Sequence, residues 1–94
     1  MLAKLPNKLE NVPKESLDHE ILRAGIIAEL DAINFYEQMA ALTENRDIKS
    51  ILMDIAKEEK THVGEFQALL LKLDRQQAGE MEAGRKEVEE ELSE

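Results

Sequence analysis

The chain has 94 residues, which is the length of one small domain. Its 12 Lys and Arg against 21 Asp and Glu give a net charge of −9, so we expect no basic face that could bind nucleic-acid phosphates. The absence of cysteine excludes disulfides, iron–sulfur clusters, thiolate zinc sites and cysteine nucleophiles. No signal peptide and no apolar run of the roughly 18 residues of a membrane span are found, so we expect a cytoplasmic protein without a membrane partner.

Helical periodicity divides the chain into three parts. Residues 1–13 contain Pro6 and Pro13 and are predicted to form an irregular N-terminal arm. Within residues 14–74, apolar residues recur at helical spacing in two runs, which predicts two long helices. Polar residues at 45–47 interrupt the pattern, and Asn45 or Asp47 suits the N-cap of the second helix. We therefore expect an all-α fold, a long antiparallel helical hairpin with a short turn.

Residues 75–94 form an acidic C-terminal segment. Gly79 and Gly84 punctuate it, and its seven glutamates argue against burial. The segment is therefore either a short C-terminal helix or a solvated tail.

Three ionisable residues occur among apolar residues of the two predicted helices: Glu29 in the first, and Glu59 and His62 in the second. Each has mainly apolar neighbours three, four and seven residues away, so it shares their face of the helix. Glu29 and His62 each lie about 16 residues from the turn, hence roughly 24 Å from it, with Glu59 one turn nearer. We therefore expect the three side chains at one level of the hairpin.

The spacing of Glu59 and His62 suits a metal centre. Glu-x-x-His places a carboxylate and an imidazole on one side of a helix, where both can bind one cation. Carboxylate and imidazole without sulfur suit iron, manganese or zinc. Ferritin-like di-metal bundles take one Glu from each of two helices and a Glu-x-x-His pair from each of two more. This chain supplies half of that set, so we expect a homodimer that forms a four-helix bundle around two metals.

Simpler interpretations exist for these residues and their neighbours. A buried Glu–His pair can fix the register of helices without metal, although three such groups would be costly to bury. Tyr36 lies seven residues beyond Glu29, so it could hydrogen-bond a ligand or place its ring in the core and its hydroxyl at the edge. Glu58 could support His62 or be solvated. The pattern favours a surface position for Asp31.

Two stretches resemble the encapsulated ferritins, which are half-length members of the ferritin-like superfamily. They are AELDAINFY at residues 28–36 and DIAKEEKTHVGEF at residues 54–66, and the likeness covers about residues 17–74. The resemblance implies a ferroxidase that oxidises Fe(II) to Fe(III) with dioxygen. It also implies a di-iron site formed between two chains by Glu29, Glu59 and His62, with Tyr36 nearby. The resemblance further implies that dimers assemble into rings, commonly decamers. These rings would work inside an encapsulin nanocompartment, whose shell protein stores the mineral.

The chain departs from some of these relatives in two places. Some carry a second acidic residue where Ala28 stands, which with the position of Asp31 forms a site through which metal enters. The chain ends in EEELSE rather than in the small apolar tail that addresses some relatives to the shell. Certain archaeal relatives are instead fused to the N-terminus of the shell protein, so this chain resembles either such a domain or a cargo protein without its tail.

Two other functions fit the same residues. One is another di-metal enzyme such as a rubrerythrin-like peroxidase, although its usual rubredoxin partner domain requires Cys-x-x-Cys pairs. The other is a non-enzymatic helical assembly or cargo module, in which the polar residues of the core keep the helices in register.

Overall fold

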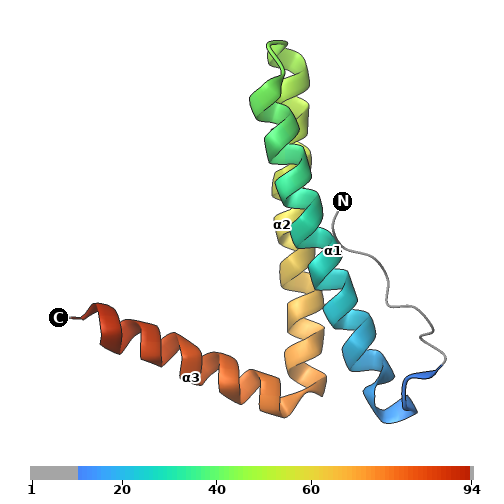
Figure 1. Cartoon of the computed structure of the whole chain (residues 1–94), viewed down its shortest axis with the longest axis vertical. Coiled ribbons are helices and arrows are strands. Elements are labelled where there is room, and N and C mark those ends of the chain that lie inside the picture. Colours follow the sequence, from blue (N-terminus) through green and yellow to red (C-terminus); the bar gives the residue numbers. More distant parts are fainter. Residues whose placement is uncertain (1–10, 94) are drawn as a thin grey trace.

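Three helices make up the part of the chain that the structure describes. The computed structural model describes residues 11–93, and these form α1 (Lys14–Leu42), α2 (Arg46–Leu73) and α3 (Arg75–Leu92) without any strand (Figure 1). The all-α prediction is confirmed. Of the arm predicted over residues 1–13, residues 1–10 lie outside the described part, and residues 11–13 lead into α1.

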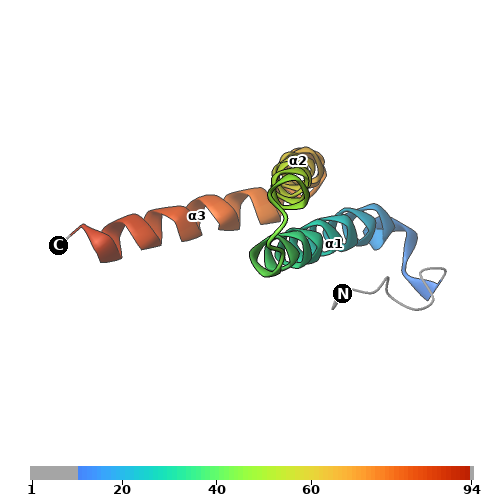
Figure 2. The same ribbon diagram turned by 90° about the horizontal axis from the view of Figure 1, so that it is seen from above.

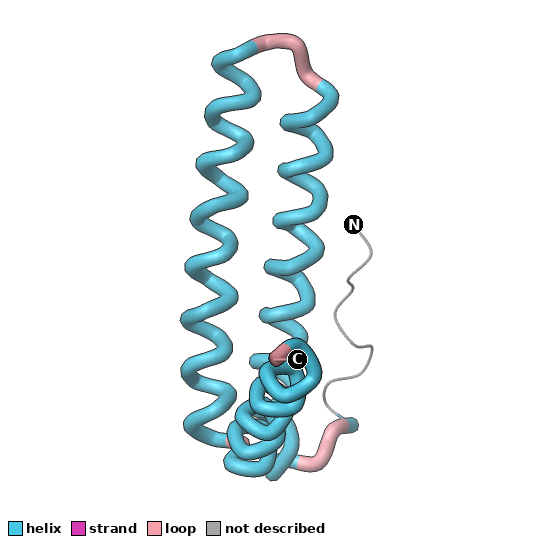
Figure 3. Tube along the Cα trace, turned by 90° about the vertical axis from the view of Figure 1, so that its left-hand side faces the viewer, coloured by secondary structure: helices cyan, strands magenta, loops and turns pink. Residues whose placement is uncertain are grey.

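Helices α1 and α2 lie side by side and form the predicted antiparallel hairpin (Figures 1 and 3). Its core consists of five buried apolar side chains: Leu22, Ile33 and Ala40 from α1, and Ala56 and Leu70 from α2. On each helix these residues are seven, eleven or fourteen positions apart, close to whole numbers of turns, so they form one stripe. The hairpin is therefore held together by a narrow seam between two helices.

The turn between the two helices is fixed by its own polar groups. Asn45 precedes α2, and its Oδ1 accepts hydrogen bonds from the backbone N–H groups of Asp47 and Ile48, both at 3.0 Å. Thr43 Oγ1 accepts from the Asn45 N–H at 3.1 Å. Of the two residues that suited the N-cap position, Asn45 occupies it. These bonds satisfy donors that the first turn of a helix leaves without a partner.

Asp74 joins α2 to α3 and ties the junction to α1. Its N–H donates to the Leu70 carbonyl at the end of α2 at 2.7 Å, and its Oδ1 accepts from the Gln77 N–H in the first turn of α3 at 3.0 Å. Its Oδ2 accepts from Arg23 of α1 at 3.0 Å, and His19 Nδ1 lies 3.7 Å from the same oxygen. One residue thus connects all three helices, through its backbone N–H to α2 and its carboxylate to α1 and α3.

Helix α3 turns away from the hairpin and extends to one side of it (Figures 1 and 2). It contains no buried residue. Along its exposed surface Arg85 forms ion pairs with Glu82 and Glu89, three and four residues away. The acidic segment is therefore a helix that depends on its cap and on local pairs rather than on burial.

The hairpin leaves large apolar side chains exposed. Ile51 and Leu73 on α2 are 61% and 51% exposed, and Ile27 on α1 is 55% exposed. Two helices packed along one seam cannot cover the remaining sides of each other, so these residues have no cover within a single chain. None of the described helices is both long and apolar enough to span a membrane.

Candidate metal centre

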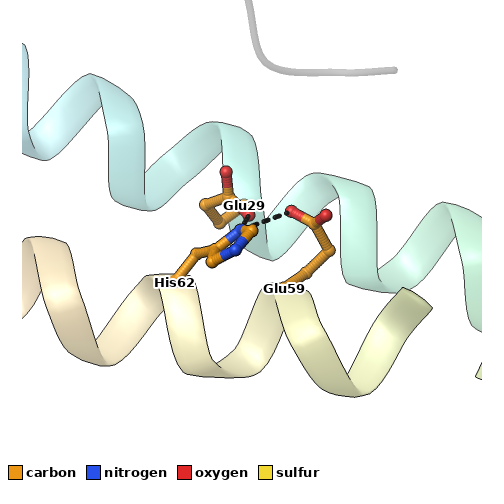
Figure 4. A group of neighbouring side chains, drawn as sticks. All are labelled: Glu29, Glu59 and His62. Atoms are coloured by element: carbon orange, nitrogen blue, oxygen red, sulfur yellow. Dashed lines mark hydrogen bonds and ion pairs between the residues drawn. The ribbon is translucent and has the colours of Figure 1, made fainter. Parts of the chain in front are cut away.

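Glu29, Glu59 and His62 come together midway along the hairpin and are called the triad below (Figure 4). His62 Nδ1 lies 3.3 Å from Glu29 Oε2 and 3.5 Å from Glu59 Oε2. One ligand atom from each of the three lies within 4.8 Å of the other two, and no further group of this kind occurs among the described residues. The three residues that spacing placed at one level are thus neighbours in the structure.

Two regular helices are sufficient to position the triad. Glu59 and His62 are three residues apart on α2, so both side chains leave the helix on the same side. Glu29 approaches from the antiparallel helix α1, and its carboxylate meets the imidazole across the seam. Because each residue lies well inside a long helix, its backbone is held by hydrogen bonds on both sides. The ligand backbones are therefore rigid.

The triad lies at the edge of the seam. The side chains of Glu29 and Glu59 are 19% and 18% exposed, and that of His62 is 45% exposed. Apolar neighbours at helical spacing therefore put these groups beside the core, where water still reaches the imidazole. A cluster of two carboxylates and one imidazole at such an edge can accept a cation from solvent.

His62 presents Nδ1 to both carboxylates. When this nitrogen carries a proton, it can donate a hydrogen bond to Glu29 Oε2. Binding of a metal to Nδ1 requires the same nitrogen to be free of its proton. The proton and a metal ion therefore compete for the space between the two carboxylates.

An open cavity of about 380 Å³ adjoins the triad. Its lining consists of Glu29 and His62 together with three residues of α2: Glu65, Phe66 and Leu69. Phe66 and Leu69 lie four and seven residues after His62, on the same side of α2. Glu65 is exposed but lies at the cavity beside the triad. The sequence signal for this location is its spacing: Glu65 lies three residues after His62, one turn along α2 and on the same side of the helix.

Exposed apolar residues lie on the same side of α2 as the triad, two to three turns away from it. Ile51, Leu69 and Leu73 lie eleven, seven and eleven residues from His62, so all three share its side of the helix. They are 61%, 53% and 51% exposed. We call this side of the hairpin the site face. Its combination of metal-binding groups and uncovered apolar surface is the main feature of the candidate centre.

The structure leaves the other sequence-predicted site residues outside the triad. The Tyr36 ring is partly buried and packs against Phe35, with the ring centroids 5.7 Å apart. Glu58 is exposed and Asp31 is partly exposed. Neither belongs to the group of ligand atoms that could share one ion. Any role of these three residues in supporting or supplying the site stays a prediction.

Comparisons with known proteins all lead to one family. The model of the EncFtn-like family matches residues 4–86. A ferritin-like–encapsulin shell fusion protein of Pyrococcus furiosus is 56% identical over 86 residues, covering 92% of this chain and 25% of that protein. The encapsulin nanocompartment cargo protein EncC of Myxococcus xanthus is 41% identical over 70 residues, covering 71% of this chain and 54% of that protein. The chain thus matches about a quarter and about half of the lengths of these relatives.

A solved structure gives the same result for the fold. The crystal structure of the encapsulated ferritin domain from Pyrococcus furiosus superposes on this chain with a TM-score of 0.83. The two sequences are 49% identical, and the match covers 97% of this chain and 96% of the other. The resemblance found from the two sequence stretches is confirmed.

Proposed function

Because the chain belongs to the EncFtn-like family, the encapsulated ferritins, we propose that it is a ferroxidase whose metal centre forms between two copies of the chain. The substrate is Fe(II), which dioxygen oxidises to Fe(III). The observation that carries the proposal is the triad: two carboxylates and one imidazole meet at a partly exposed site, on a face of the hairpin that also carries uncovered apolar side chains.

The chemistry of the triad fits iron. Carboxylate oxygens and an imidazole nitrogen are ligands for iron, manganese and zinc, and no thiolate is present to favour a softer metal. Membership of a ferritin family supports iron among these ions. Manganese and zinc are expected to bind the same groups as substitutes, because the ligands do not distinguish sharply between them.

A second copy of the chain supports the centre in two ways. A two-fold interface places the same surface patch of each copy against the other, so pairing through the site face brings two triads together. The two hairpins then form a four-helix bundle in which four carboxylates and two imidazoles surround two ions, the ligand set of ferritin-like di-metal proteins. The same contact covers Ile51, Leu69 and Leu73, which a single chain leaves exposed.

The carboxylates and the imidazole of the triad have different parts in the reaction. Glu29 and Glu59 would supply the negative charge that holds the cations, and His62 would supply a neutral nitrogen ligand once Nδ1 has lost its proton. Two Fe(II) would together give up two electrons, which with two protons would reduce one dioxygen to hydrogen peroxide.

A second uncovered surface supports a larger assembly. Ile27 lies two residues before Glu29, so it leaves α1 on nearly the opposite side, and it is 55% exposed. A dimer formed through the site face keeps such residues available for contacts with further dimers, which supports a ring such as a decamer. The names of the relatives, a shell fusion and a nanocompartment cargo protein, support association with an encapsulin shell in the cytoplasm.

The proposal is tested by Fe(II) oxidation in air at equal chain concentration. We expect Glu59→Ala and His62→Ala each to lower the rate by at least about tenfold, because each removes a ligand from both halves of the centre. Asp54→Ala is the matched control, since it removes an exposed carboxylate from the same helix outside the triad, and we expect it to keep the parent rate. A helical, dimeric parent no faster than buffer would instead favour the assembly module.

A further inference from the structure

The Phe66 ring lies against the backbone of α1 at Gly25. A Cβ atom added to Gly25 would be 3.1 Å from two carbons of this ring and 3.2 Å from a third. Such separations are tighter than most carbon–carbon contacts, so an added methyl group would require the ring to shift by a few tenths of an ångström. Glycine inside a helix weakens the helix relative to alanine. The close approach of the Phe66 ring gives a physical reason for a glycine at position 25.

This contact is one helical turn away from the triad on both helices. Gly25 lies four residues before Glu29 on α1, and Phe66 lies four residues after His62 on α2. Because the helices are antiparallel, the Gly25–Phe66 pair and the Glu29–His62 pair are successive contacts along the hairpin, one turn apart. The Gly25–Phe66 contact therefore bears on the separation of the helices one turn away, where Glu29 and His62 meet at 3.3 Å.

Phe66 also shares a cavity with the two ligands. Its side chain lines the open cavity of about 380 Å³ beside Glu29 and His62. The ring thus lies against α1 at Gly25 and borders the same cavity as the imidazole of His62, one turn away on α2.

From these contacts we propose that Phe66, seated on Gly25, is a positioning residue for the metal centre. It fixes the distance between α1 and α2 and the orientation of the His62 imidazole, so that Nδ1 faces the two carboxylates before a cation binds. The inference rests on the proposed ferroxidase centre. It adds that the affinity and the coordination geometry of the metal depend on an apolar contact that touches no metal.

The test uses Co(II), whose visible absorption spectrum reports the coordination geometry. In Gly25→Ala the new methyl group requires the Phe66 ring to shift by a few tenths of an ångström, and we expect Co(II) to bind roughly tenfold more weakly with a changed spectrum. In Phe66→Leu the ring is gone, so we expect weaker binding with a changed spectrum as well. In the double variant the smaller leucine admits the methyl group, so its loss in affinity should be less than the product of the two single losses.

Gly64→Ala is the matched control, because a Cβ added to Gly64 meets nothing within 4 Å. It makes the same chemical change in a helix, and we expect unchanged Co(II) affinity and spectrum. Parent-like affinity and spectrum in Phe66→Leu, or in a folded Gly25→Ala, would overturn the positioning role while leaving the centre itself intact. A parent that binds no Co(II) would overturn the metal centre, and the positioning role with it.

Discussion

Ala56 is 1% exposed and lies one turn before Glu59, so its methyl group occupies the seam directly beside the triad. A small side chain at this point lets α1 and α2 approach closely, and the close approach carries Glu29 to within 3.3 Å of His62. At the scale of single residues, the geometry of the site therefore depends on small side chains in the seam as much as on the ligands.

A larger residue at position 56 should damage stability and the site together. We expect Ala56→Leu to lower the free energy of unfolding by about 1–3 kcal/mol, because a fully packed seam has no room for the added carbons. By forcing the helices apart it should also weaken Co(II) binding. Urea unfolding and Co(II) titration measure the two effects. Ala68→Leu makes the same change at an exposed position of α2 and should stay within about 0.5 kcal/mol of the parent; equal effects of the two substitutions would contradict the account.

The triad could be predicted from the sequence because a helix has a constant rise. Residue numbers alone placed Glu29, Glu59 and His62 at one level once the turn was located near Asn45. Their role as ligands stays a prediction. The 45% exposure of the His62 side chain could not be predicted in this way. Periodicity gives the direction of a side chain but not the width of the contact between two helices. The approach of Phe66 to Gly25 depends on that same contact.

At the scale of elements, Asp74 determines how α3 leaves the hairpin. The hydrogen bond from the Gln77 N–H is the main cause that holds the pKa of Asp74 below its usual value of 3.8, and burial opposes it. The hydrogen bond from Arg23 and the positive charges nearby lower this pKa further. A carboxyl group with a lowered pKa in the folded state stabilises that state in its charged form.

We expect the stability that this charge contributes to be complete above pH 3.8 and to be lost as the pH falls through the lower folded-state pKa. Asp74→Asn keeps an oxygen for the Gln77 N–H but loses the charge, so its deficit relative to the parent should vanish in acid. Asp74→Ala loses the cap as well and should lose part of the α3 helix at every pH. Circular dichroism from pH 2 to 7 measures both; a deficit of Asp74→Asn that persists unchanged in acid would contradict this role.

The elements differ in how far the sequence could predict them. The hairpin has an apolar stripe on each helix and a polar break at its turn, so periodicity and the capping residue indicate the same structure. Helix α3 has no buried residue, and its acidic composition fits a solvated tail equally well. Its direction depends on contacts of Asp74 with His19 and Arg23, more than fifty residues away in the sequence, which no local pattern could indicate.

At the scale of the whole molecule, the proposed centre is complete only when two hairpins meet. A single chain offers three ligands and a site face with exposed Ile51, Leu69 and Leu73. Pairing removes this apolar surface from water and places two sets of ligands around two ions. Assembly and catalysis should therefore be lost together when the site face is altered away from the triad.

The measurement that tests this claim most directly is the Fe(II) oxidation rate per chain of a double variant that carries both Ile51→Glu and Leu73→Glu. Light scattering on the same sample determines its molecular mass. Both residues are exposed and lie eleven positions from His62, so each chain should keep its helices and its triad. The account predicts monomers that oxidise Fe(II) no faster than buffer, whereas Ile27→Glu, off the site face, should keep the dimer and its rate. Monomers of the double variant that oxidise Fe(II) at the parent rate would contradict a centre shared between two chains.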